Sequence, residues 1–102
     1  MARGGAGVGY WSMSAVSLTA KTDGERLALV AAGSWTAERA AELEKIIEET
    51  ARRHVGARSV DIDLAKLERL DTFGAWLIER LKRTFLIRGS AALITGPTSI
   101  AA

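Results

Sequence analysis

The stretch Val60–Leu81, VDIDLAKLERLDTFGAWLIERL, decides the fold, because it holds a predicted strand, a connector and the start of a helix in that order. Apolar and acidic side chains alternate over residues 59–64, which is typical of a half-buried β-strand. Residues 65–70 form a short connector. A helix is then predicted from about Thr72 to Arg88, where Gly89 ends the pattern.

A second helix precedes this stretch and a last strand follows it. Thr36 is a favourable N-cap for a helix over Thr36–Arg53, and Gly56 is its stop signal. Its apolar positions recur every three or four residues, at Ala40, Leu43, Ile47 and Ala51. Residues 91–95, AALIT, form a short apolar strand. Strands separated by helices favour parallel pairing through right-handed crossovers.

The sequence of the first part of the domain predicts a β-hairpin. Residues 15–20 and 26–32 form two short strands, and the turn between them contains the pair Asp23-Gly24. The predicted element order is therefore β-β-α-β-α-β. We expect an α/β fold with a mixed four-stranded sheet and two amphipathic helices on one face.

The chain divides into a flexible N-terminal tail, residues 1–14, and one domain, residues 15–102. Four glycines lie within the first nine residues, which favours a flexible segment. Pro97-Thr98-Ser99 is typical of a helix start, but only three residues follow it. We therefore expect the last helix to be missing or truncated.

Composition excludes several classes of protein. A chain of 102 residues that is 48% hydrophobic and 25% charged fits one globular domain. The absence of cysteine excludes a disulfide scaffold, and a single histidine, His54, argues against a histidine-based triad or metal site. The net charge of +2 comes from interspersed signs, which is no signature of nucleic-acid binding. No stretch has the apolar length of a membrane helix, so we expect a cytoplasmic chain.

Two motifs in the deciding stretch resemble the STAS domain family, named for sulphate transporters and anti-sigma-factor antagonists. The strand contains Asp63-Leu64, and Asp71-Thr72-Phe73-Gly74 then opens the helix, in the order that the family uses. The resemblance covers residues 15–95. It implies a STAS-like fold and a regulatory, non-catalytic domain that binds proteins. The family has a further helix after the last strand, which this chain lacks or only begins.

Two segments are similar to one branch of that family, the STAS domains fused to or partnered with bacterial lipid-transporting ABC permeases of the maintenance-of-lipid-asymmetry type. The segments are Gly33-Ser34-Trp35-Thr36 and residues 70–77, LDTFGAWL. This resemblance implies a module that contacts the transporter's ATPase subunit on the cytoplasmic side of the inner membrane. Under that hypothesis the native chain continues past Ala102 into membrane spans.

Thr72 has three open interpretations. A threonine at a helix start is a favourable N-cap or first-turn residue, and an exposed one can contact a partner. In the anti-sigma-antagonist branch the hydroxyl residue at this place is the phosphoacceptor, so the resemblance implies phosphorylation of Thr72. The alternative function is therefore a free-standing anti-sigma factor antagonist switched by phosphorylation at Thr72.

The helix that starts at Thr72 has two apolar facets when residues are placed 100° apart. The predicted core facet consists of Gly74, Leu77, Ile78, Leu81 and Phe85. A second facet carries aromatic residues beside arginines, which is typical of an interface hot spot. We therefore predict partner contacts at Thr72, Phe73, Trp76, Arg80 and Arg83. The alternative is that the N-terminal tail or a last helix covers Trp76.

The sequence offers no catalytic or metal-binding set of residues. Asp61 and Asp63 have no histidine or third carboxylate close by, so we expect a solvated strand face instead of a metal site. The glycine-rich start follows no strand and opens no helix, which argues against a phosphate-binding loop. We expect no enzymatic activity, no metal and no cofactor. Trp35 is expected in the core.

Overall fold

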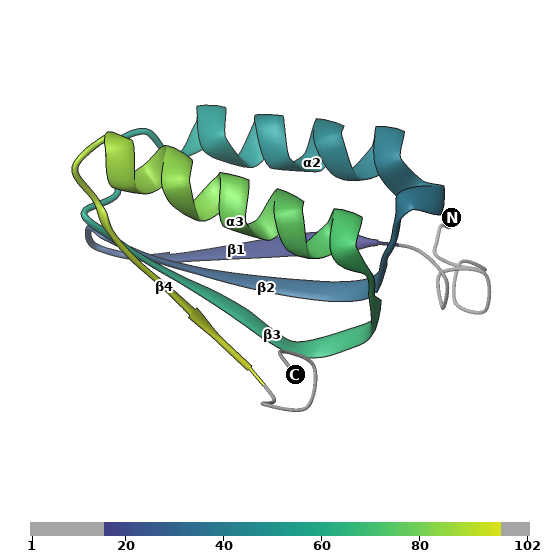
Figure 1. Cartoon of the computed structure of the whole chain (residues 1–102). Coiled ribbons are helices and arrows are strands. Elements are labelled where there is room, and N and C mark those ends of the chain that lie inside the picture. The colour runs from purple at the N-terminus through teal and green to yellow at the C-terminus, as the bar shows by residue number, and fades with distance from the viewer. Residues whose placement is uncertain (1–15, 97–102) are drawn as a thin grey trace, which may run out of the picture.

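A computed structural model describes residues 16–96, so the predicted tail and the helix signal after Gly96 lie outside the described residues. The elements are β1 (Ser17–Asp23), β2 (Arg26–Trp35), the 3₁₀ helix η2 (Ala37–Arg39), α2 (Ala40–Arg53), β3 (Ser59–Leu70), α3 (Thr72–Ile87) and β4 (Ala91–Thr95). The sheet order is β1-β2-β3-β4, with β1 antiparallel to β2 and the other neighbours parallel. Figure 1 shows α2 and α3 side by side on one face of this sheet. The predicted mixed α/β architecture and element order are confirmed.

The core lies between the sheet and the two helices. Along β2 every second residue from Leu27 to Trp35 is buried, because alternate side chains point to the helix-covered face. All residues of the predicted core facet of α3 are buried. Trp35 is fully buried, and its indole N–H donates to the Ala32 carbonyl at 3.0 Å. The core position predicted for Trp35 is therefore confirmed.

The two central strands are longer than the sequence predicts. β2 continues to Trp35 beyond the expected break at Gly33, and β3 continues to Leu70 through the expected connector. The register of β2 against β3 shifts twice, the second time between Gly33 and Ser34. Such bulges interrupt the alternation of apolar and polar residues. For this reason the segment LAKLERL, residues 64–70, does not show the sequence pattern of a strand although it forms one. Gly33 has a φ of +88°, which a residue with a Cβ rarely adopts.

The first helix also begins differently from the prediction. A 3₁₀ turn, η2, precedes α2, and the Thr36 side chain forms no capping hydrogen bond. The Ala37 N–H at this start is instead bonded to Asp71, which lies far along the chain. Thr36 therefore occupies the N-cap position, as predicted, but its side chain does not cap the helix, because the Asp71 carboxylate accepts the Ala37 N–H.

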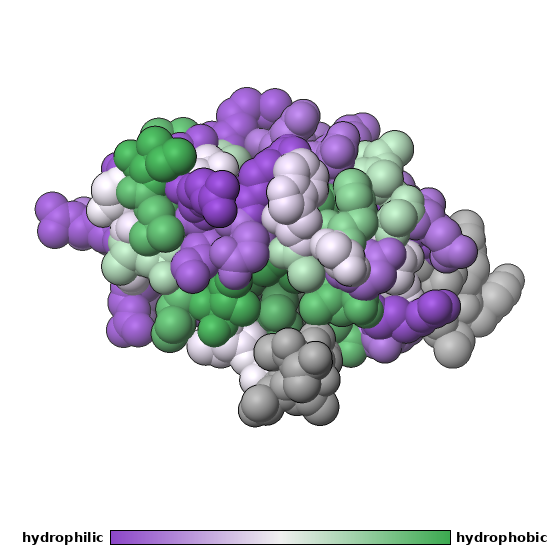
Figure 2. Space-filling view, in the orientation of Figure 1, coloured by the Kyte–Doolittle hydropathy of each residue, from purple (hydrophilic) through white to green (hydrophobic). Residues whose placement is uncertain are grey.

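The hydrophobic side chains near α3 and β4 are less buried than those at the centre of the core. Residues that pack against the core here but stay half-buried are Leu64, Leu70, Ala92 and Ile94. Figure 2 shows hydrophobic residues gathered in a band below α3 in this view. Nothing within residues 16–96 covers these side chains fully.

The topology gives the molecule two ends of different character. α2 and α3 both begin where β2 and β3 finish, and both finish where β3 and β4 begin (Figure 1). We call the first the motif end, because it holds Asp71-Thr72-Phe73-Gly74. We call the second the basic end, and it consists of residues 52–58 and 86–90.

Candidate functional site

Asp71 is the N-cap of α3, and its carboxylate joins the starts of two helices. Its Oδ1 atom accepts from the Gly74 N–H at 2.9 Å, and its Oδ2 atom accepts from the Ala37 N–H, also at 2.9 Å. The Asp71 N–H donates to the Trp35 carbonyl at 3.3 Å. The carboxylate thus pairs N–H groups that helices leave free at their starts. One side chain therefore fixes the start of α3 to the chain that follows β2.

The same hydrogen bonds hold the pKa of Asp71 below its ordinary value of 3.8. The Gly74 N–H contributes most and the Ala37 N–H next, because both bonds favour the charged carboxylate. Asp71 is therefore ionised at neutral pH. A fixed negative charge lies directly beside Thr72.

Gly74 lets α3 approach the end of β2 closely. A Cβ atom added at Gly74 would lie 2.0 Å from the Trp35 carbonyl oxygen and 3.0 Å from Cδ1 of Leu70. No other residue fits without moving the helix. Gly74, which the sequence predicts on the core facet of the helix, is therefore the point where α3 packs directly on the end of β2.

Thr72 is the first residue of α3 and does not cap it, because Asp71 holds that position. Of the two structural roles predicted for Thr72, N-cap or first-turn residue, the structure shows the first-turn role. The Thr72 side chain is exposed, and its hydroxyl forms no hydrogen bond to any residue from 16 to 96. The phosphoacceptor hypothesis needs such an accessible hydroxyl, whereas the partner-contact hypothesis needs only an exposed side chain.

Phe73, Trp76 and Arg80 form a stack along the first turns of α3. The ring centroids of Phe73 and Trp76 lie 6.1 Å apart, and the Arg80 guanidinium lies 5.2 Å from the Trp76 centroid. Trp76 is 52% exposed, whereas Phe73 is partly buried against the core. Arg83 is exposed one turn beyond the stack and makes no ion pair with another described residue. The structure therefore brings three of the five predicted contact residues into one stack, with Thr72 exposed at the start of the same helix and Arg83 at the margin.

The sequence did not reveal the long-range bonds of Asp71. An aspartate three residues before Gly74 is a recognisable N-cap signal. The bond from Ala37 spans 34 residues, so no local pattern announces it. The sequence therefore shows that the motif starts a helix but not that it connects two helix starts.

The two carboxylates of β3, Asp61 and Asp63, are both half-buried. Asp63 accepts from the Ala65 N–H at 2.8 Å, at the place where the strand register first shifts. Among residues 16–96 there is no group of three or more His, Cys, Asp or Glu side chains that could hold a metal ion. In the same range no helix has the length and apolar character needed to cross a bilayer.

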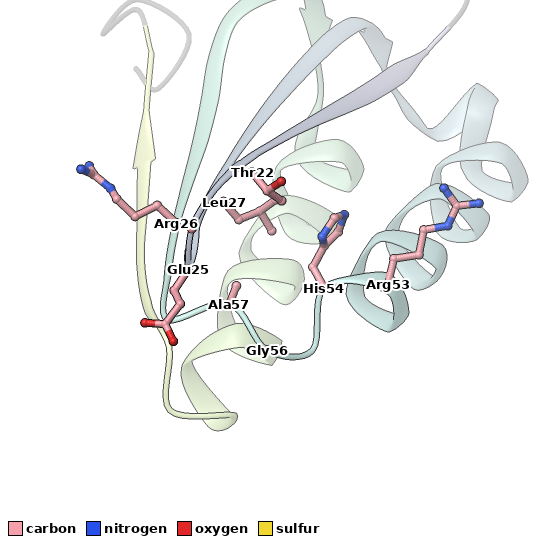
Figure 3. Close-up of a pocket in the computed structure, with 9 residues that line it drawn as sticks. Thr22, Glu25, Arg26, Leu27, Arg53, His54, Gly56 and Ala57 are labelled. Atoms are coloured by element: carbon pink, nitrogen blue, oxygen red, sulfur yellow. The ribbon is translucent and has the colours of Figure 1, made fainter.

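A pocket of about 210 Å³ lies at the basic end, between the β1–β2 turn and the end of α2. Figure 3 shows that the guanidinium groups of Arg26 and Arg53 and the carboxylate of Glu25 point away from it. The volume is also below the usual range of small-molecule sites. We therefore assign no ligand to this pocket.

Comparison with known proteins identifies the fold. No protein-family model and no curated protein sequence match the chain. A STAS domain of an anti-sigma-factor antagonist from Rhodobacter sphaeroides superposes with a TM-score of 0.69 at 15% identity, over 83% of this chain and 90% of that one. A protein called Mglu superposes over 80% of this chain with a TM-score of 0.68 at 23% identity, and the match spans only 20% of Mglu. The described chain therefore has the STAS-like α/β fold.

Proposed function

We propose that this chain is a non-catalytic regulatory module that binds a protein partner through the start of α3. The observation that supports the proposal most is Trp76, which is half exposed while Phe73 and Arg80 hold its ring. Aromatic residues beside arginine are enriched in interface hot spots. Asp71 and Gly74 fix the helix start beneath them, so a partner meets a preorganised surface.

The partner in this proposal is the ATPase subunit of a lipid-transporting ABC transporter. The support comes from residues 33–36 and 70–77, which resemble the STAS domains of such transporters. The proposed contact residues are Thr72, Phe73, Trp76, Arg80 and Arg83. The native chain would then be attached to a permease or act beside one, at the cytoplasmic face of the inner membrane.

A binding titration against that ATPase subunit tests the proposal. Trp76→Ala should cost about 2 kcal/mol or more of binding free energy if Trp76 is a hot spot. Thr72→Glu should also weaken binding, while an acidic residue at a helix start leaves folding nearly unchanged. Leu93→Ala is the matched control, because it shortens another exposed apolar side chain on β4 and should leave binding intact. Undiminished binding by folded Trp76→Ala and Thr72→Glu proteins would place the interface elsewhere.

A free-standing anti-sigma factor antagonist is the second candidate function. Two observations favour it, namely the exposed Thr72 hydroxyl at the start of α3 and the fold shared with the Rhodobacter sphaeroides domain. A kinase would transfer the γ-phosphoryl group of ATP to the Thr72 oxygen, with ADP as the leaving group and release of the hydroxyl proton. The modification adds close to two negative charges beside ionised Asp71, which would alter partner binding.

Thr72→Val separates the two functions, because it removes the hydroxyl and keeps the size of the side chain. Under the transporter hypothesis the variant should bind the ATPase subunit almost as well as the unchanged protein. Under the antagonist hypothesis it should take up no phosphate from the cognate kinase. A permease reading frame adjoining this one supports the first function, and a neighbouring kinase gene supports the second.

A further inference from the structure

Two segments far apart in the sequence form one surface at the basic end. Residues 52–58 (RRHVGAR) and 86–90 (LIRGS) contain four arginines and one histidine and no acidic residue. The β1–β2 turn at the same end adds Arg26 and two acidic residues, Asp23 and Glu25, so the net charge of this end stays positive. The Ser90 hydroxyl donates to the Ala57 carbonyl at 2.6 Å, and the Ala91 N–H donates to the Arg58 carbonyl at 2.8 Å. The Arg88 side chain donates to the Ala51 carbonyl at the end of α2. These bonds hold the two loops together.

Exposed aliphatic side chains are concentrated on the same surface. Val55 is 60% exposed, Leu86 46% and Ile87 79%. They are three of the five large hydrophobic residues that are exposed within residues 16–96. Figure 2 shows hydrophobic residues beside hydrophilic ones at the end of the molecule where α3 finishes in Figure 1. Packing within the described domain does not account for this exposure.

The arginines differ in how far they are engaged. Arg58 pairs with Glu25 at 3.1 Å, and Arg88 lies over the Phe85 ring. Arg52 and Arg53 are exposed and form no ion pair with any described residue. Arg52 and Arg53 lie in the last turn of α2, where a positive charge interacts favourably with the helix dipole. This interaction alone is enough to account for basic residues at these two positions. It does not explain why aliphatic residues are exposed next to them.

We propose that the basic end docks on the anionic surface of a lipid bilayer. The arginines face the headgroup phosphates, and Val55, Leu86 and Ile87 enter the boundary between headgroups and acyl chains. This contact is peripheral and does not rest on the function proposed above, which uses the opposite end of the molecule.

The composition of the surface favours lipid over other anionic partners. Nucleic-acid phosphates attract arginine but offer no apolar layer for exposed aliphatic side chains. Protein interfaces are enriched in aromatic residues, and the exposed aromatic residue of this domain, Trp76, lies on the other surface. Two copies of this chain meeting here would bring Arg52 and Arg53 of one copy, which form no ion pair with a described residue, against those of the other, so repulsion opposes a dimer.

The topology is compatible with this orientation. β1 begins beside the end of β2, and β4 ends beside the middle of β3, so neither Val16 nor Gly96 lies at the basic end. The described chain therefore enters and leaves the domain away from the proposed contact. The Thr72–Trp76 surface remains accessible to a protein while the basic end faces lipid.

Cosedimentation of the full chain with lipid vesicles tests the proposal. The chain should bind vesicles of equal parts phosphatidylglycerol and phosphatidylcholine, bind pure phosphatidylcholine vesicles far more weakly, and be released by high salt. Each arginine near an anionic surface contributes about fivefold, so Arg52→Gln with Arg53→Gln should weaken binding about 25-fold. Ile87→Ser should weaken binding severalfold at unchanged charge.

The matched control is Lys66→Gln with Arg69→Gln, which removes the same charge from exposed residues near the motif end. It should change vesicle binding by no more than about twofold. Equal weakening by both double variants would show an effect of net charge only and would overturn the proposal. So would vesicle binding that survives loss of Arg52 and Arg53, or that is indifferent to phosphatidylglycerol. Binding to duplex DNA, or dimerisation, without vesicle binding would also overturn it.

Discussion

The motif end and the basic end are held together by different interactions. At the motif end one carboxylate, Asp71, bonds two helix starts, and Gly74 brings a helix into contact with strand backbone. At the basic end two loops are joined by the buried Ser90 hydroxyl and by the Arg88 side chain. The bonds at the first end converge on one short side chain, Asp71. Those at the second end come from several residues, among them the bond from Ser90 to Ala57 at 2.6 Å and the bond from Ala91 to Arg58 at 2.8 Å.

Charge by itself does not reveal which end binds a partner. Glu38, Glu42 and Asp71 lie at helix starts, whereas Arg52 and Arg53 lie at a helix end, and both sets complement the helix dipoles. What differs is the uncharged exposed surface. An aromatic stack lies near one end and aliphatic side chains lie at the other, which is why we assign them to different partners.

The largest effect on stability should come from Gly74→Ala. The new Cβ atom would lie 2.0 Å from a backbone oxygen, so α3 must move away from β2. We expect a loss of about 3 kcal/mol in the free energy of unfolding. Gly56→Ala at the basic end is the control, because its Cβ would have nothing within 4 Å, and it should change stability by about 0.5 kcal/mol at most. Urea denaturation of both variants measures the difference, and equal losses would contradict this comparison of the ends.

Asp71→Ala should have the next largest effect. It leaves the Gly74 and Ala37 N–H groups without their carboxylate partner, although water can reach this exposed site. Asp71→Asn keeps one acceptor oxygen and should be intermediate. The urea midpoint should therefore fall in the order native protein, Asp71→Asn, Asp71→Ala. An Asp71→Ala midpoint equal to that of the native protein would show that the bridge does not stabilise the fold.

The contribution of Asp71 should also depend on pH with a definite sign. Its pKa is lowered in the folded chain, so the unfolded chain takes up the proton first as the pH falls. The stabilisation is complete above the ordinary pKa of 3.8 and is lost as the pH falls through the lower folded value. The difference in urea midpoint between native protein and Asp71→Asn should be constant near neutrality and shrink in acid. A difference that grows on acidification would contradict the assignment.

At the basic end, Ser90→Ala should cost about 1 kcal/mol. Ser90 is buried, and its hydroxyl donates to the Ala57 carbonyl at 2.6 Å, so the variant leaves that acceptor without its partner. Thermal or urea unfolding measures the loss. A loss of unfolding free energy as large as that of Gly74→Ala would show that the contacts at the basic end stabilise the fold as much as those at the motif end.

The sequence predicted the fold where burial follows a simple period. The core facet of α3 was predicted correctly because helix geometry places Gly74, Leu77 and Phe85 on one side. The ends of β2 and β3 were missed because two register shifts break the alternation that marks a strand. Periodicity therefore located the layers of the fold but not the full length of its central strands.

The sequence predicted which residues start α3 but not the bonds that hold this start in place. The motif predicted Thr72, Phe73 and Trp76 at a helix start, which the structure contains. The N-cap of α3 is Asp71, which also bonds Ala37, and Thr72 is the first residue of the helix. Bonds between residues 34 positions apart depend on the packing of β2 against β3, which local patterns do not encode.

The smallest effect on stability should come from Trp76→Ala, which tests the exposed aromatic surface itself. Trp76 is 52% exposed and touches mainly Phe73 and Arg80, and alanine has the higher helix propensity. We expect a loss of about 1 kcal/mol or less in the free energy of unfolding.

A buried tryptophan in that position would instead cost about 3–5 kcal/mol on truncation to alanine. Such a loss would mean that chain outside residues 16–96 covers Trp76, and a covered residue cannot anchor a partner. Trp76→Phe is the companion variant, because it keeps an apolar ring and should be close to neutral in either case. Stability near that of the native protein, together with weakened partner binding, is the combination that only an exposed contact residue produces.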